Sequence, residues 1–272
     1  MTSIARSNKN VRFTLVFDMT PETIKAELLS FAESDPRIEV FHSAHANPGS
    51  ARNVGLNHLE AEWVTFFDAD DSFFVDDLLT VIEAISTEVD VTISNYRICN
   101  SSSSLEEKRH LVPNTFMIDA NWKAIARYPG IWRWVFRSST LTNLRFREIR
   151  MGEDVCFLVD YLGENRKVYF SDCTAYEYSS QNPNQLTQNS VAMKDLIVAL
   201  RFALDSIQKS GSSNIELRLD LASLLFYSCL RRSSNLGRFN TLSVMIKFLI
   251  GSKLRLRQAF RIVVSRFKVM YG

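Results

Sequence analysis

Short apolar runs alternate with longer segments of mixed polarity through the first third of the chain. The runs are rich in β-branched and aromatic residues, which predicts strands at residues 11–18, 37–42, 63–67 and 89–94. The segments between them begin with capping residues or proline, which predicts helices at residues 22–35, 51–59 and 75–86. Strands that alternate with helices at this spacing are typical of an α/β fold, here with a mostly parallel sheet flanked by helices.

The run at residues 63–67, Trp-Val-Thr-Phe-Phe, is almost wholly apolar and predicts a strand buried on both faces. Three carboxylates, Asp68, Asp70 and Asp71, follow it directly. The carboxyl end of a strand in an open parallel sheet faces the crevice where ligands bind, and hard oxygen ligands there favour Mg²⁺ or Mn²⁺. The alternative is a polar turn that caps the helix predicted from Val75.

The pattern changes after about residue 100. Residues 131–136, Ile-Trp-Arg-Trp-Val-Phe, contain aromatic side chains that could stack on a ligand, although large aromatics more often pack in a core, and we expect at least one of them there. From residue 190 onward the spacing of apolar residues is helical. We therefore expect an α/β domain over residues 1–188 and a helical, basic extension over residues 189–272.

Cysteine usage and apolar stretches indicate a cytoplasmic protein. The four cysteines form no CxxC pair and no zinc spacing, so we expect reduced thiols. Residues 1–10 lack the apolar core of a signal peptide, and no later stretch reaches the length of a membrane span.

The net charge of +2 hides an asymmetry, because ten Lys and Arg residues but no Asp or Glu follow Asp220. In residues 256–268, apolar side chains lie on one helical side and Arg257, Arg261 and Lys268 on another. Such a helix can lie on an anionic membrane surface, at the inner face of the membrane, or pack on the domain with its basic side in water. Nucleic-acid binding is not expected, since the first 220 residues are acidic on balance.

Four blocks of the sequence resemble the family 2 glycosyltransferases of the GT-A fold. They are Leu-Val-Phe-Asp at 15–18, Asn-Pro-Gly-Ser-Ala-Arg-Asn-Val-Gly-Leu at 47–56, Phe-Phe-Asp-Ala-Asp-Asp at 66–71 and Gly-Glu-Asp-Val at 152–155. Their order and spacing match the family over roughly residues 11 to 180, and the second and third blocks seldom occur together by chance. The resemblance implies transfer of a sugar from a nucleotide-diphosphate donor, with a UDP-sugar favoured, to a glycan or lipid-linked acceptor in bacterial surface polysaccharide synthesis.

The resemblance also implies roles for single residues at the donor site. Asp18 corresponds to the acid that touches the nucleotide base, and Arg52 and Asn53 correspond to residues that lie along the diphosphate or ribose. Asp68 and Asp70 correspond to the DxD motif. Of these two, Asp70 is favoured as the ligand of Mn²⁺ or Mg²⁺ and Asp68 as a contact to the ribose or sugar.

Asp71, which follows the DxD motif directly, is a further candidate metal ligand. A divalent metal at this motif would stabilise the charge that develops on the departing diphosphate.

The resemblance identifies Asp154 as the catalytic base. A carboxylate opposite the leaving group can take the proton of the acceptor hydroxyl as it attacks, which gives a single displacement with inversion. Glu153 would orient Asp154 or contact the acceptor, and the reverse assignment stays open. The alternative is a pair of acids favoured by the dipole of a helix N-terminus.

The sequence departs from the family at the N-terminal side. The usual first strand with its Pro-Tyr-Asn-like turn is not found before Val11, and the usual Asp-Asp-Gly-Ser turn is Phe-Asp-Met-Thr at residues 17–20. We expect that the chain starts late, that another segment or subunit fills the strand's place, or that donor binding is impaired. A catalytically impaired binding partner is therefore the first alternative. A phosphatase of the haloacid dehalogenase type is the second, since it also carries Asp-x-Asp after a strand.

Overall fold

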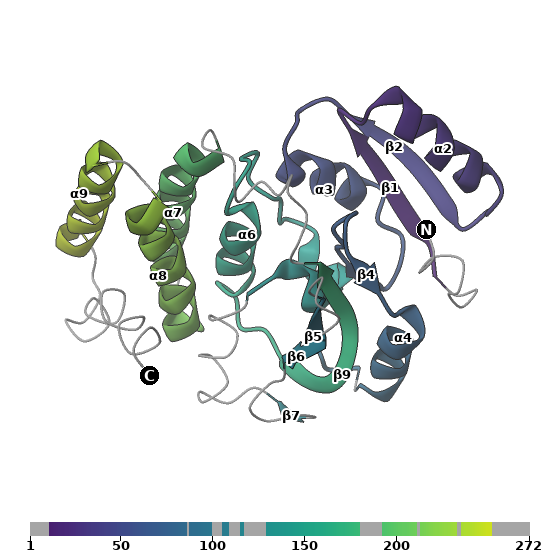
Figure 1. The fold of residues 1–272 in the computed structure, drawn as a ribbon. Helices are drawn as coiled ribbons and strands as arrows, with labels where there is room; N and C mark the ends of the chain where they lie inside the picture. The colour runs from purple at the N-terminus through teal and green to yellow at the C-terminus, as the bar shows by residue number, and fades with distance from the viewer. Residues whose placement is uncertain are drawn as a thin grey trace. The chain divides into compact units, whose positions relative to one another are not determined.

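The computed structural model describes residues 11–85, 87–99, 105–108, 115–116, 129–179, 192–210, 213–232 and 235–251 (Figure 1). By their contacts the described residues form two compact units. Unit 1 contains the strands and the helices before residue 149, and unit 2 contains residues 149–166 and the helices after residue 183. The boundary predicted at residue 188 differs from this division in one element, the helix that begins at Glu153, and it stays a prediction.

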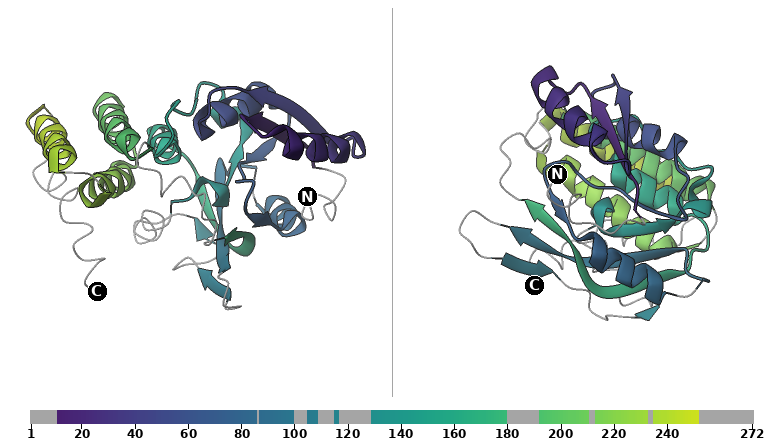
Figure 2. Two further views of the ribbon diagram at one scale, coloured as in Figure 1. Left: turned by 45° about the horizontal axis from the view of Figure 1, so that its top comes forward. Right: turned by 90° about the vertical axis from the view of Figure 1, so that its right-hand side faces the viewer.

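A two-stranded parallel sheet opens unit 1. Strand β1 (Phe13–Asp18) pairs with β2 (Ile38–Ser43), and helix α2 (Glu22–Glu33) connects them, as the alternation of the sequence predicted. Phe13 and Ile38 lie in a small core that also contains Ala32 of α2. Figure 2 shows the two strands side by side, with α2 along one side of them.

A second sheet of unit 1 has seven strands, in the order β3-β8-β5-β9-β4, with β6 on β5 and β7 on β9. Their bounds are β3 Trp63–Thr65, β4 Ser72–Phe73, β5 Val91–Cys99, β6 Leu105–Lys108, β7 Thr115–Phe116, β8 Trp134–Arg137 and β9 Val168–Ser179. The sheet is mixed: β5 and β9 are parallel, whereas β3–β8, β5–β8, β4–β9, β5–β6 and β7–β9 are antiparallel. The α/β class is confirmed, with more antiparallel pairing than the alternation of strands and helices suggested.

The prediction that residues 63–67 form a strand buried on both faces was wrong. Strand β3 ends at Thr65, is half-buried and lies at one end of the strand order. Phe66 and Phe67 leave the strand because their rings pack elsewhere, Phe66 edge-on to Phe146 and Phe67 stacked on Phe73. The acids nevertheless follow the carboxyl end of β3, as expected.

Helix α3 (Pro48–Asn57) begins three residues earlier than predicted. Its cap is Asn47, whose Oδ1 accepts the N–H of Ser50 at 2.8 Å, and Pro48 occupies the first turn where its missing N–H costs nothing. Ser50, which precedes the predicted start at residue 51, lies inside the helix. Helix α4 (Val75–Ala84) follows β4 and turns Leu78 into a core cluster with Val135.

Unit 2 is helical, with α6 (Glu153–Tyr161), α7 (Ala192–Lys209), α8 (Ile215–Arg232) and α9 (Asn235–Gly251). The apolar side predicted for α7 is buried, including Leu200 and Leu204. Arg218 of α8 is also buried; its Nε donates to the carbonyl of Val159 at 2.9 Å, and burial lowers the pKa of its guanidinium. Across the part of the chain that the structure describes, no helix is long and apolar enough to cross a membrane. The basic helix predicted at residues 256–268 lies outside that part.

The first turn of α3 lies against the backbone that follows β8. A Cβ atom added at Gly49 would lie 2.1 Å from the carbonyl oxygen of Arg147, whereas one added at Gly55 in the same helix would have Thr14 Cγ2 as its nearest neighbour, at 3.9 Å. Only a glycine at position 49 allows this approach.

We expect Gly49→Ala to lower the free energy of unfolding by about 2–3 kcal/mol, because backbone must shift to relieve the overlap. Urea unfolding followed by circular dichroism would measure it. Gly55→Ala is the matched control and should raise stability by about 0.5–1 kcal/mol, since alanine loses less entropy in a helix. Equal stabilities for the two variants would contradict the close approach.

Candidate functional site

The three acids after β3 form a tight turn that leads into β4. The N–H of Asp71 donates to the carbonyl oxygen of Asp68 at 3.2 Å, which closes the turn. Asp70 is exposed, and Asp68 and Asp71 are half-buried. The turn therefore presents carboxylate oxygens both to solvent and to the protein.

Arg52 of α3 supplies a positive charge to this turn. Its Nη2 lies 2.8 Å from Oδ1 of Asp68, and its guanidinium lies over the ring of Phe146, 5.4 Å from the centroid. The Arg52 side chain is 13% exposed and that of Asp68 is 40% exposed. The ion pair thus holds a guanidinium at the same turn that carries the exposed acid Asp70.

Asp71 ties the turn to the last residues of β9. One carboxylate oxygen accepts the hydroxyl of Tyr176, and the other accepts the N–H of Ser179 at 2.7 Å. Burial raises the pKa of Asp71 to about 6, the two hydrogen bonds partly offset this, and the nearby acids Asp70 and Asp68 add to it. Burial and the carboxylates of Asp68 and Asp71 raise the pKa of the Tyr176 hydroxyl. Both carboxylate oxygens of Asp71 thus accept hydrogen bonds from the protein. The spacing of residues 68–71 in the sequence could not predict these contacts.

Aromatic rings extend from this contact. Trp132 stacks on Tyr176, with centroids 4.4 Å apart and an interplanar angle of 9°, and lies 5.9 Å from the ring of Tyr178. Trp132 is half-buried, whereas Trp134 and Phe136 are fully buried. The prediction that at least one of the three aromatics belongs to the core is confirmed.

Asp18 organises the turn before α3. Its Oδ1 accepts the N–H groups of His45 and Ala46, both at 3.0 Å, and its Oδ2 accepts that of Asn47 at 2.8 Å. Ala46 has φ 50°, a left-handed conformation that side chains rarely adopt, so the carboxylate holds a strained turn. Its predicted contact to a nucleotide base stays a prediction.

Asn53 binds the segment after β8. Its side-chain amide donates to the carbonyl of Phe146 at 2.9 Å, and its carbonyl accepts the N–H of the same residue at 2.8 Å. These two bonds fix the ring of Phe146 beneath Arg52. A contact from Asn53 to diphosphate or ribose also stays a prediction.

Glu153 and Asp154 lie in unit 2, in the first turn of α6. Glu153 is buried, and Asp154 is half-buried with its Oδ1 accepting the N–H of Val155 at 2.7 Å. Gly152 precedes them with φ 84°, and a Cβ there would lie 2.8 Å from that of Ala199. Gly152 therefore sets how the two acids enter the helix.

The acids of the turn are the groups that could hold the divalent metal that the resemblance implies. Among the described residues no three His, Cys, Asp or Glu side chains gather to hold a metal ion by themselves. Asp68 and Asp70 do provide hard oxygen ligands at a partly exposed turn, and Mg²⁺-type ions are commonly held by one or two carboxylates together with substrate phosphates. The residues fit a metal that is completed by a bound diphosphate.

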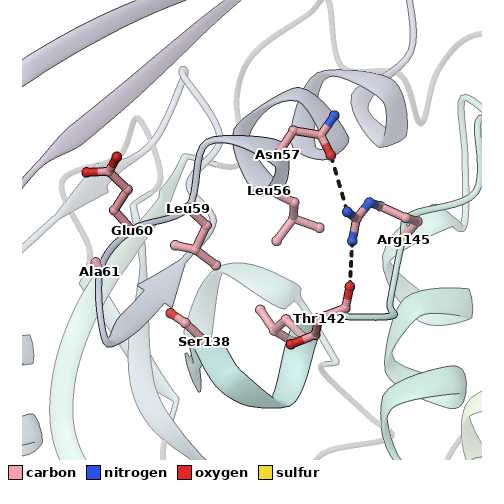
Figure 3. Close-up of a pocket in the computed structure, with 9 residues that line it drawn as sticks. Leu56, Asn57, Leu59, Glu60, Ala61, Ser138, Thr142 and Arg145 are labelled. Carbon is pink, nitrogen blue, oxygen red and sulfur yellow. Dashed lines mark hydrogen bonds between the residues drawn. The ribbon is translucent and has the colours of Figure 1, made fainter.

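A cavity of about 450 Å³ lies at the other end of β3 (Figure 3). Its lining residues are Leu56, Asn57, Leu59, Glu60, Ala61, Ser138, Leu141, Thr142 and Arg145. Arg145 spans it, donating to Asn57 Oδ1 at 3.2 Å and to the carbonyl of Thr142 at 3.3 Å. Ser138, which lines the cavity, directly follows Arg137, and Arg137 pairs with Trp63 at the start of β3. The cavity therefore adjoins the amino end of β3, away from the carboxylates.

A profile of the family described as Glycosyl transferase family 2 matches residues 1–161. The chain belongs to this family. It is 26% identical over 165 residues to an uncharacterized glycosyltransferase of Rickettsia felis, covering 60% of this chain and 27% of that protein. It is 29% identical over 191 residues to the uncharacterized glycosyltransferase EpsJ of Bacillus subtilis, covering 66% of this chain and 55% of EpsJ. The chain thus spans about a quarter to half of the length of these relatives.

Solved structures share the GT-A fold of this family member. Residues 1–349 of Staphylococcus aureus TarS, solved in complex with UDP-GlcNAc, superpose with a TM-score of 0.72 at 17% identity, covering 91% of this chain and 75% of that one. The mannosyltransferase PcManGT of Pyrobaculum calidifontis, solved with GDP-Man and Mn²⁺, gives a TM-score of 0.55 at 11% identity, covering 100% and 75%. These likenesses establish the fold alone.

We expect Asp71→Asn to become more stable relative to the wild type as the pH rises from 4 to 7. The folded-state pKa of Asp71 is raised above its ordinary value, so the folded protein binds more protons than the unfolded chain in this window and loses stability as Asp71 ionises. Asparagine does not ionise and can still bond Tyr176 and Ser179. Urea unfolding without divalent ions should show a change of about 1–2 kcal/mol after allowance for solvent screening. A constant difference would contradict the raised pKa.

Proposed function

We propose that this chain transfers a sugar from a nucleotide-diphosphate donor, preferentially a UDP-sugar, to a glycan or lipid-linked acceptor in surface polysaccharide synthesis. The observation that carries the proposal is the Arg52–Asp68 ion pair beside exposed Asp70, at the carboxyl end of β3 in a family 2 chain. The site works in the cytoplasm, where the nucleotide-sugar donor is at hand, and the acceptor is reached at the inner face of the membrane.

The donor assignment rests on charge and on shape. Arg52 can contact the diphosphate without leaving its position, since its guanidinium is already held by Asp68 and the ring of Phe146. Asp18 and Asn53 keep the turn before α3 and the segment at residue 146 in place around it. The TarS and PcManGT structures, with UDP-GlcNAc and GDP-Man, support a nucleotide-sugar donor on this fold.

The carboxylates of Asp70 and Asp68 would hold Mn²⁺ or Mg²⁺, with Asp71 behind them as the residue that positions the turn. When bound there, the metal supplies positive charge to the diphosphate as it departs. Mn²⁺ in the PcManGT structure supports this donor set. Ionised Asp68 and Asp70 repel one another less when a cation lies between them, so metal and diphosphate should bind together.

Asp154 serves as the general base and Glu153 orients it. The base removes the proton of the acceptor hydroxyl, so that the oxygen attacks the anomeric carbon from the side opposite the diphosphate and inverts its configuration. Asp154 is half-buried at the start of α6, which keeps its carboxylate within reach of solvent, whereas buried Glu153 is suited to a supporting role.

Isothermal titration of UDP and of GDP with and without Mn²⁺ tests the donor site. We expect UDP binding that strengthens with Mn²⁺, and we expect Asp70→Asn to weaken the Mn²⁺-dependent part by about tenfold or more, since one of two metal ligands loses its charge. Asp76→Asn, an exposed acid in the first turn of α4, is the control and should bind as the wild type does. If the wild type bound UDP equally well with and without Mn²⁺, the assignment of Asp70 as a metal ligand would be wrong.

Release of UDP from UDP-GlcNAc, measured with membrane lipid extract as acceptor, tests the base. Asp154→Asn should lower turnover by about 10²–10⁴-fold while UDP affinity changes less than about twofold. Asp205→Asn, an exposed acid of α7, controls for loss of charge in unit 2. Full turnover by the Asp154 variant would assign the base to another group.

A further inference from the structure

Helix α9 carries an exposed apolar stripe, formed by Phe239, Leu242, Ile246 and Ile250. These side chains are 75%, 45%, 55% and 81% exposed. Spacings of three and four residues place all four on one face of the helix. Single exposed apolar side chains are common on protein surfaces, but a row of four large ones along one helix marks an interaction surface.

The stripe is not the face that holds α9 to the protein. Thr241, Met245 and Phe248, on the other side of the helix, are buried. That side packs on α7 and α8, and Figure 1 shows α9 beside these two helices. The helix therefore has its packing face already, and the exposed stripe is a second apolar face.

Cations border the stripe. At 100° per residue, Arg238 lies on one side of it and Lys247 on the other, and both are exposed. Arg231 and Arg232, at the end of α8, are exposed as well. Arg238 Nε donates to the carbonyl of Leu230 at 2.9 Å, which is a neutral partner. No Asp or Glu occurs in the sequence after Asp220, so no acidic side chain of this segment offsets these positive charges.

We propose that the exposed stripe of α9 binds the surface of an anionic lipid bilayer, with the helix axis in the plane of the membrane. The four apolar side chains would enter the boundary between headgroups and acyl chains, and Arg238 and Lys247 would lie level with the anionic headgroups. Charge complementarity favours this occupant over a second copy of the chain. A two-fold contact through the stripe would place Arg238 and Lys247 of both copies around one interface, and no Asp or Glu of residues 221–251 would offset them.

This inference goes beyond sugar transfer, and it rests on residues that the candidate donor site and the base do not use. It would hold the protein at the surface on which a lipid-linked acceptor lies. The two hypotheses can fail separately, because one is measured by vesicle binding and the other by nucleotide binding.

Flotation of the full chain with vesicles tests the proposal. Wild-type protein should float with phosphatidylcholine vesicles that contain about one-third phosphatidylglycerol, and the partition coefficient should fall about tenfold or more on pure phosphatidylcholine. Ile246→Ser with Ile250→Ser should lower binding to the anionic vesicles by about tenfold or more. The matched control is Ile24→Ser on α2 of unit 1, where a side chain with 49% exposure is changed, and it should bind as the wild type does.

A second variant covers the case in which the double variant fails to fold. Lys247→Glu leaves the stripe intact and should lower binding to anionic vesicles by about tenfold, with no effect on neutral vesicles. Asp70→Asn should float like the wild type, and the stripe variant should keep wild-type affinity for UDP and Mn²⁺.

Several results would overturn the proposal. These are no flotation of the wild type, equal flotation on neutral and anionic vesicles, and unchanged flotation of a folded stripe variant or of Lys247→Glu. Light scattering adds one more: a wild-type dimer that the stripe substitutions convert to a monomer, without vesicle binding, would assign the stripe to self-association.

Discussion

The candidate donor site depends on how α3 is held between segments that are distant in sequence. Asp18 binds the turn before the helix through three N–H groups, and Gly49 lets its first turn touch the backbone of Arg147. Asn53 then binds both backbone groups of Phe146, and Arg52 reaches Asp68. Each contact restricts the same helix, so the guanidinium is presented to the carboxylate turn by a rigid support rather than by a loop.

The carboxylate turn combines groups that would be unfavourable alone. Asp71 is half-buried near two other acids, and it is tolerated because Tyr176 and Ser179 donate to both of its oxygens. The stacked ring of Trp132 keeps Tyr176 in position for this bond. Arg52 neutralises the neighbouring Asp68, and Asp70 is the exposed acid of the turn.

Local patterns in the sequence predicted the elements whose partners are close by. The β1 strand, the α7 helix and the acids after β3 follow from periodicity and capping, and the family resemblance was confirmed. The length and burial of β3 could not be predicted, because an apolar run reads the same whether its phenylalanines stay in the strand or, like Phe66, pack on residue 146. The contacts of Asp71 could not be predicted from the local sequence either, because Tyr176 lies 105 residues further along the chain. The basic amphipathic helix predicted at residues 256–268 stays untested, while the stripe on α9 emerged only from side-chain exposure.

The long span of these contacts has a consequence for biosynthesis. The hydrogen-bond partner of Asn53 is synthesised 93 residues later in the chain, and Ser179, which bonds Asp71, is synthesised 108 residues later. At about 5–20 residues per second, a ribosome needs several seconds to a few tens of seconds to pass from the turn to its fastening residues. During that interval the emerging chain already carries the acids and Arg52 but not the groups that order them. The turn is thus among the last parts of unit 1 to be completed, because Asp71 gains its two hydrogen-bond donors only after β9 has been made.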